Sequence, residues 1–194
     1  MRHTVPAGTT DDAATSPTVV RIEDMPSPVG DLLVATDDVG VLVAVAWGEC
    51  EDGLQADLRR RYGVSGARLS GMGKSAAVSA LEAYFAGEPG AFEHLPLSTG
   101  GTDFQRSVWQ ELRAIPLGET ISYRMLAERI GRPSAMRAVG LANGANPIPI
   151  VIPCHRVIGA DGSLTGFGGG LDRKRWFLDH ERAAGVREQP RLPL

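Results

Sequence analysis

Residues 122–143 read SYRMLAERIGRPSAMRAVGLAN, and this stretch decides how the second half of the chain folds. Ser122 can cap a first helix, which Gly131 ends. A proline turn comes next, after which Ser134 can cap a second helix that reaches about Asn143. Two short helices joined by a glycine-containing turn have the spacing of a helix-turn-helix. Many folds contain such a pair, so the spacing by itself leaves DNA binding open.

The second helix carries one long charged side chain, Arg137, among small residues. Small side chains let another backbone approach closely, which predicts a tight interface. Packing against another helix would explain the small residues equally well, but it leaves Arg137 without a role. The small positions are Ala135, Ala138, Gly140, Ala142 and Gly144.

Positive charge concentrates around this segment, although the whole chain has a formal net charge of -3. Residues 1–101 hold 7 basic and 14 acidic side chains, whereas residues 102–182 hold 11 basic and 8 acidic ones. Between residues 120 and 160, five arginines stand against the single acid Glu128. Phosphate binding needs such a segment, although a solvated arginine face has the same composition.

An apolar run at 148–153, IPIVIP, leads directly to Cys154. Its prolines exclude a fully paired central strand and predict a buried extended segment. A free cysteine is most often inert packing, but an imidazole at His155 and a guanidinium at Arg156 would favour the thiolate. Adjacent residues on a strand point to opposite faces, so we expect the proton to pass between Cys154 and His155 through a bridging water.

The stretch 171–182 predicts a helix in which Phe177 and Glu181 lie four residues apart, on one stripe. A buried carboxylate needs a partner, and His155 is the natural one. Cys154, His155 and Glu181 would then act as nucleophile, base and orienting group. A surface glutamate at a helix end is the alternative.

Glycines crowd the loop that follows the thiol, around Phe167. Their backbone amides are accessible, which suits a flat ligand, although a mobile linker would have the same composition. The glycines are Gly159, Gly162, Gly166, Gly168, Gly169 and Gly170.

The first half of the chain predicts a small α+β domain. Three Val-, Leu- and Ile-rich segments separated by turns predict an antiparallel meander at 18–24, 32–36 and 41–47. Helical patterns follow at 53–62 and 75–85. Past the glycine joint, Thr102 or Asp103 can cap a helix that buries Phe104, Val108, Leu112 and Ile115.

These patterns divide the chain into five parts. We expect a disordered leader at 1–17, an α+β domain at 18–97 and a flexible linker at 98–101. A C-terminal domain at 102–182 and a tail at 183–194 complete the chain.

Composition narrows the functional class further. No apolar run approaches the roughly 18 residues of a membrane span, and no signal peptide precedes the first strand, so we expect a cytoplasmic protein. Cys50 and Cys154 are too few for a disulfide framework and do not form a Cys-x-x-Cys pair, so we expect no metal site.

Five motifs together resemble the O6-alkylguanine-DNA alkyltransferases, also called methylated-DNA--protein-cysteine methyltransferases. The resemblance covers about 101–182 and depends most on the run Pro-Cys-His-Arg at 153–156. The motifs are GETISY at 118–123, RAVG at 137–140, NGANP at 143–147, IPCHRVI at 152–158 and GFGGG at 166–170.

The resemblance implies a small ribonuclease-H-like N-terminal domain followed by a helical C-terminal domain with the helix-turn-helix. It also implies DNA repair by irreversible, stoichiometric transfer of an alkyl group from O6-alkylguanine, and in some cases O4-alkylthymine, to Cys154. The partner would be double-stranded DNA bound through its minor groove, with the damaged base flipped out. We expect a monomer that uses no cofactor.

The resemblance also assigns roles to single residues. Cys154 would accept the alkyl group, His155 would act as base through water, and Glu181 would orient it. Asn146 would tie the recognition helix to the active-site turn, and Tyr123 would help to protonate the departing guanine. Contacts to DNA would come from Arg137, in the gap left by the flipped nucleotide, and from Ser134, Ala135, Gly140 and Tyr123; the base pocket would include Val157, Phe167 and Gly168.

The sequence departs from the family pattern at Phe167, where many relatives carry tyrosine; stacking survives and the hydroxyl is lost. The chain also lacks the Cys and His ligands of relatives with an N-terminal zinc site. Two other functions stay open at this point. One is a helix-turn-helix regulator or damage sensor without transfer chemistry, and the other is a cysteine hydrolase that turns over repeatedly without DNA.

Overall fold

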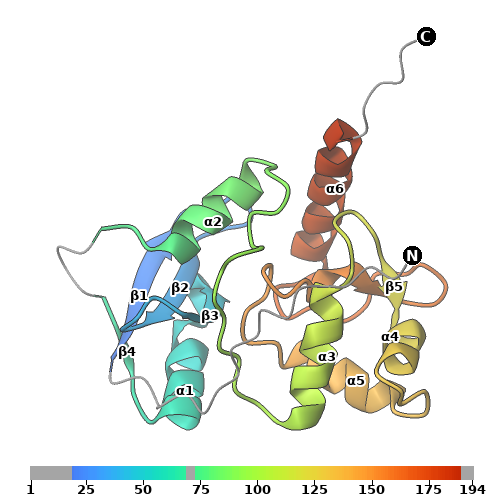
Figure 1. Ribbon diagram of the computed structural model, residues 1–194, viewed down its shortest axis with the longest axis horizontal. Coiled ribbons are helices and arrows are strands. Elements are labelled where there is room, and N and C mark those ends of the chain that lie inside the picture. Colours follow the sequence, from blue (N-terminus) through green and yellow to red (C-terminus); the bar gives the residue numbers. More distant parts are fainter. Residues whose placement is uncertain (1–18, 69–72, 189–194) are drawn as a thin grey trace.

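The computed structural model describes residues 19–68 and 73–188, with side chains as far as residue 185 (Figure 1). The leader expected at 1–17 and the last residues of the expected tail, 189–194, lie outside these ranges. The architecture is α+β, with a small sheet in the first half and helices in the second. Within the described ranges, no helix combines the length and the apolar character needed to cross a membrane.

The N-terminal sheet has four strands in the order β3-β2-β1-β4. Strands β1 (Val20–Met25), β2 (Leu32–Asp37) and β3 (Leu42–Trp47) form the predicted antiparallel meander. Strand β4 (Gly66–Ala67) pairs parallel to β1. The sequence analysis missed β4 because two residues carry no periodicity.

Both faces of the sheet are covered, which explains why β2 is buried at nearly every position. Leu33 and Ala35 pack with Leu54 and Leu58 of α1 (Glu51–Tyr62). The alternate residues of β2 face α2 (Ala76–Phe85) and the C-terminal half. Helix α2 begins where predicted, because the Ser75 hydroxyl accepts a hydrogen bond from the Val78 amide.

The described part of the C-terminal half contains four α-helices, a one-turn 3-10 helix (Cys154–Arg156) and a short parallel pair of strands. Its elements are α3 (Asp103–Arg113), β5 (Ile121–Ser122), α4 (Tyr123–Arg129), α5 (Met136–Gly144), β6 (Val157–Ile158) and α6 (Leu171–Glu188). Thr102 and Gln105 form a capping box at the start of α3. Helices α4 and α5 are the two helices of the predicted helix-turn-helix (Figure 1).

Two predicted helix ends are wrong. Ser134 does not cap α5: the Ala135 amide donates to the Arg132 carbonyl, which closes a turn through Ser134 and delays the helix start to Met136. Helix α6 does not end at Arg182 but continues to Glu188. No proline interrupts residues 183–188, and a single glycine costs a helix only about 1 kcal/mol.

The two halves are connected by the segment 98–101, and they share one apolar core. The larger apolar cluster includes Val45 and Trp47 of β3 together with Phe177 of α6. The Ser98 amide donates to the Leu42 carbonyl, and Arg61 donates to the Thr99 carbonyl. These hydrogen bonds connect the segment 98–101 to the first half, and the linker there stays a prediction.

Candidate active site

The segment before Cys154 is buried but not extended, which corrects the prediction. The Ile152 amide donates to the Ile148 carbonyl at 2.9 Å, so the chain doubles back. Ile150, at the tip, has φ of +77°, a strained value for a β-branched residue. Asn146 holds both ends of this turn: its Nδ2 donates to the Ile152 carbonyl at 2.8 Å, and its Oδ1 accepts from the Ile148 amide at 3.0 Å.

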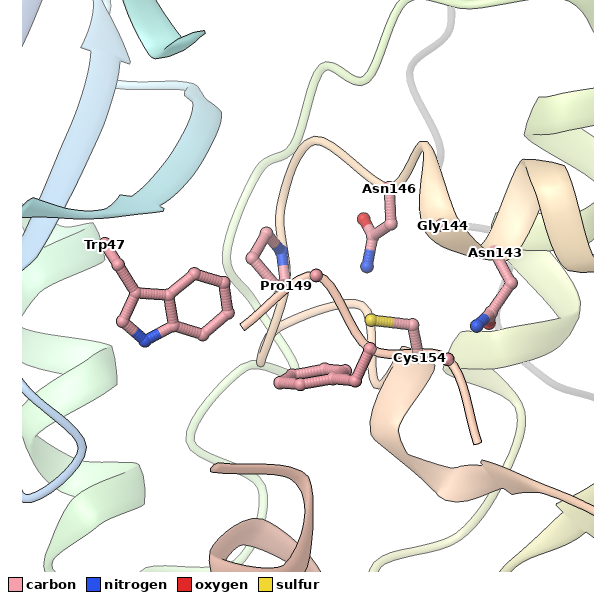
Figure 2. Close-up of a pocket in the computed structure, with 9 residues that line it drawn as sticks. Trp47, Asn143, Gly144, Asn146, Pro149 and Cys154 are labelled. Carbon is pink, nitrogen blue, oxygen red and sulfur yellow. The ribbon is translucent and has the colours of Figure 1, made fainter. Parts of the chain in front are cut away.

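Cys154 begins a one-turn 3-10 helix and is 5% exposed. Its thiol lies in the wall of a pocket with about 50 Å³ of free volume (Figure 2). The helix α5 end, the turn, the glycine loop and strand β3 all contribute to this wall. The other lining residues are Trp47, Asn143, Gly144, Asn146, Pro149, Gly166, Phe167 and Gly168.

Glu181 has four polar partner residues from three parts of the chain, although it is fully buried. It lies 2.8 Å from Nε2 of His155 and accepts from Nε and Nη2 of Arg156 at 2.8 and 2.9 Å. The Tyr84 hydroxyl donates to it at 2.9 Å, and the Gly118 amide at 3.3 Å. Burial alone would raise the pKa of this carboxyl, but the hydrogen bonds from His155 and Arg156 and the charge of Arg156 outweigh burial and hold the pKa well below its usual range.

The ionised carboxylate determines which nitrogen of His155 carries the hydrogen. Burial lowers the pKa of His155 more than Glu181 raises it, so the imidazole is neutral. A carboxylate only accepts, so Nε2–H donates to Glu181 and Nδ1 keeps its lone pair. Nδ1 is buried and has no hydrogen-bond partner among the described residues. His155 is therefore oriented to take a proton at Nδ1.

The expectation that Arg156 favours the thiolate is wrong. Its guanidinium turns away to Glu181 and to the Ile115 carbonyl, 2.5 Å from Nη1. Burial raises the pKa of Cys154, although the Asn146 side chain and the Lys174 charge act in the opposite direction. The thiol is therefore neutral before substrate binds, and attack requires a proton acceptor.

Lys174 is a site residue that the sequence analysis missed. It is fully buried, and its Nζ donates at 2.6 Å to the carbonyls of Val157 and Thr165. Because Lys174 precedes Phe177 and Glu181 by three and seven residues, the helical stripe could have revealed it. Val157 itself is fully buried behind the pocket and does not line it, unlike Phe167 and Gly168.

Tyr123, the first residue of α4, lies beside the glycine loop. Its hydroxyl donates to the carbonyls of Thr165 and Gly166 at 3.4 Å each. Burial raises its pKa, so it stays a phenol and a proton donor. A side chain at Gly140 of α5 would reach its ring at 4.0 Å, which is ordinary contact.

The helix-turn-helix carries several exposed arginines. Ser134 and Arg137 are exposed there and Ala135 is half-buried, and Arg137 forms no ion pair with any described residue. Leu141 is 77% exposed on the same helix, an apolar position that the sequence analysis did not single out. Three further exposed arginines of the helix-turn-helix form no ion pair with any described residue: Arg124, Arg129 and Arg132.

Nowhere in the described parts of the chain do three His, Cys, Asp or Glu side chains gather closely enough to hold a metal ion. The reactive groups that the structure brings together at this site are a thiol, an imidazole, a carboxylate and a phenol.

Comparison with known proteins gives consistent results over almost the whole described chain. The family model "6-O-methylguanine DNA methyltransferase, ribonuclease-like domain" matches residues 20–99, and that of the "DNA binding domain" of the same family matches residues 103–183. The methylated-DNA--protein-cysteine methyltransferase of Salmonella typhimurium is 48% identical over 160 residues, which cover 82% of this chain and 94% of the relative.

Solved structures of related proteins agree with these sequence matches. The crystal structure of the Mycobacterium tuberculosis O6-methylguanine methyltransferase superposes with a TM-score of 0.68 at 44% identity, covering 86% of this chain and 94% of that one. A crystal structure of the same organism's OGT in complex with DNA gives a TM-score of 0.68 at 43% identity, with the same coverage. These matches confirm the fold class and the resemblance, and the chain belongs to the 6-O-methylguanine DNA methyltransferase family.

Proposed function

We propose that this protein repairs DNA by moving an alkyl group, above all the methyl group of O6-methylguanine, onto Cys154. One observation carries this proposal: the Cys154 thiol lies in a pocket wall, directly before an imidazole that an ionised carboxylate orients. The family's DNA-binding domain model and the DNA complex of a related protein support DNA as the partner.

The reaction needs a proton acceptor and a proton donor, and the site contains both. A bridging water carries the thiol proton to Nδ1 of His155, and Glu181 stabilises the imidazolium that forms. Sulfur then attacks the alkyl carbon as the bond from that carbon to O6 breaks, and the purine leaves with the electron pair. The purine takes up one proton from the Tyr123 phenol, and the phenol regains a proton through water from the His155 imidazolium, so that the thiol proton ends on guanine and both side chains are restored.

The product is a thioether at Cys154. Neither water nor an imidazole cleaves such a carbon–sulfur bond readily, so each molecule reacts once. This outcome separates the proposal from a cysteine hydrolase, whose acyl-enzyme is hydrolysed and turns over. A regulator or sensor without transfer chemistry has no support, because it would need neither the thiol nor the His155–Glu181 pair.

We propose that the helix-turn-helix enters the minor groove as a monomer and that Arg137 fills the gap left by a flipped base. The small residues of α5 allow a close approach to the groove, and the four arginines without ion pairs suit phosphates. Flipping is required because a thiol in a pocket cannot reach O6 inside a stacked duplex. Ser134, Ala135 and Gly140 would contact the DNA backbone.

The remaining assignments follow from the geometry of the turn and the loop. Asn146 positions Cys154 by fixing both ends of the preceding turn. Phe167 and Gly168 receive the base. The chain divides into an N-terminal domain at 18–97 and a C-terminal domain at 102–182.

The decisive experiment is mass spectrometry after incubation with duplex DNA containing one O6-methylguanine. The peptide that contains Cys154 should gain the mass of one methylene, at one group per protein molecule. Cys154→Ala should gain nothing, and the control Cys50→Ser, at an exposed cysteine, should react like the wild type. Methylation of Cys50 in the wild type, or none at all, would overturn the proposal.

A further inference from the structure

Trp47 belongs to strand β3 of the N-terminal half, yet its indole forms part of the pocket that contains the Cys154 thiol. It is 6% exposed. Figure 2 shows the indole beyond Pro149, across the pocket from Asn143 and Asn146. The pocket thus has a polar side, formed by two asparagines, and an apolar side that ends at a residue of the other domain.

The indole is held in place by contacts on several sides. Its ring meets Phe167 edge to face, with centroids 5.7 Å apart, and the Arg173 guanidinium lies 5.0 Å from the ring centroid. Arg173 is itself fixed by Glu49 at 2.6 Å. A side chain at Gly169 would come within 2.7 Å of the indole, so the loop is packed closely against the ring. Trp47 is therefore a rigid wall.

Trp47 lies on the side of the pocket that a larger alkyl group would enter. In an in-line displacement, sulfur, carbon and oxygen share one axis, and the other substituents of that carbon project sideways. A methyl group projects only hydrogens, whereas a longer group projects its remaining carbons into one side of the pocket. Hydrocarbon avoids the amides of Asn143 and Asn146 and takes the apolar side, along Pro149 and Phe167 towards Trp47.

Space on that side is limited. The free volume of the whole pocket is about 50 Å³, which is enough for a few water molecules. A methyl group adds little beyond the base itself, whereas a benzyl ring extends along the apolar side to the indole. The indole N–H is buried without a hydrogen-bond partner in the described chain, so shape rather than polar bonding accounts for the tryptophan here.

We propose that Trp47 sets the upper size of the alkyl group that Cys154 accepts, so that the N-terminal domain contributes substrate specificity to a site built by the C-terminal domain. This inference rests on the proposed function. It assigns Trp47 as a specificity-determining residue, and it makes small alkyl groups the preferred substrates.

The test compares two lesions in the same duplex, O6-methylguanine and O6-benzylguanine, in single-turnover experiments. Trp47→Phe and Trp47→Leu should raise the ratio of benzyl to methyl transfer rates, the Leu variant by about tenfold or more, the scale on which a hydrophobic pocket discriminates by size. Trp47→Phe retains an aromatic ring, so the series stays informative if the Leu variant does not fold. The matched control is Trp176→Phe, a tryptophan on α6 that stacks on His180 and does not line the pocket.

The two possible failures are distinguishable. If the wild type takes no methyl group, the proposed function fails and this inference fails with it. If methyl transfer proceeds and the benzyl-to-methyl ratio of the Trp47 variants equals that of the wild type and of Trp176→Phe, the inference alone is overturned.

Discussion

The Tyr84 hydroxyl donates a 2.9 Å hydrogen bond to Glu181, so a residue of the N-terminal domain touches the carboxylate that orients His155. Both side chains are buried, and burial raises the pKa of Tyr84 well above its usual value. The phenol is therefore a permanent donor. The N-terminal domain therefore contributes to the pocket and also to the proposed proton relay, which runs from the Cys154 thiol through water to His155 and its partner Glu181.

Tyr84→Phe removes this donor and leaves the ring packing in place. We expect the free energy of unfolding to fall by about 1–3 kcal/mol, because a buried carboxylate loses a hydrogen bond. We also expect the pH dependence of methyl transfer to shift, because the Glu181 carboxylate that accepts from His155 has then lost one of its donors. Chemical denaturation and rate–pH profiles measure the two effects.

The matched control is Tyr62→Phe, which removes a hydroxyl that donates to the Ser98 carbonyl far from the thiol. It should lower stability slightly and leave the rate–pH profile unchanged. If both variants shift the profile equally, Tyr84 has no specific link to the relay.

Glu181→Gln should lower the free energy of unfolding more than Tyr84→Phe does. It leaves the Arg156 guanidinium buried without a counter-charge, which costs about 3–5 kcal/mol when a buried pair is broken. The Glu181 pKa is lowered in the folded protein, so its contribution to stability is present above the unfolded pKa and is lost as pH falls through the folded value. The variant should therefore be less stable than the wild type near neutral pH, and its free energy of unfolding should fall less steeply as the pH is lowered.

The same variant tests the relay. Without the carboxylate, the imidazolium of His155 is less stable and the pKa of His155 falls further, so alkyl transfer should be slower and the pH of its half-maximal rate should move lower. Single-turnover rates between pH 5 and 9 measure this. An unchanged profile would assign Glu181 to structure only.

Arg137→Ala should slow repair in duplex DNA by about tenfold or more while leaving the reaction with free O6-benzylguanine nearly unchanged, because only the duplex reaction requires flipping. Arg60→Ala, at an exposed arginine of α1, serves as the control and should affect neither substrate. Equal losses on both substrates would remove the proposed role of Arg137.

Arg124 and Arg129 are expected to contact phosphates. Either one changed to alanine should weaken binding to all duplexes and reduce the slope of the logarithm of affinity against the logarithm of salt concentration by about 1. Fluorescence anisotropy at several salt concentrations measures the slope. A change that depends on the DNA sequence would instead indicate contact with bases.

The buried thiol should make the protein sensitive to alkali. Because the pKa of Cys154 is raised in the folded state, the unfolded chain releases this proton first as pH rises above about 8.5. The free energy of unfolding should then fall by up to about 1.4 kcal/mol per pH unit from this group. Cys154→Ala should show a shallower decline in denaturation experiments, and identical declines would contradict a raised thiol pKa.

The sequence by itself determined the architecture and pointed to the residues of the proposed site. The meander, the capped helices and the turn at Gly131 follow from local periodicity and capping chemistry, which act over a few residues. The run at 153–156 and the stripe containing Glu181 indicated the thiol, the base and the orienting carboxylate.

Only the tertiary structure decided which groups meet and in which charge state. Arg156 turned from the thiol to Glu181, Lys174 was buried, and Tyr84 and Trp47 reached the site from the other domain. These contacts join residues that are distant along the chain, so no local pattern encodes them. Burial, which raises the thiol pKa and lowers that of His155, likewise depends on packing around the finished core.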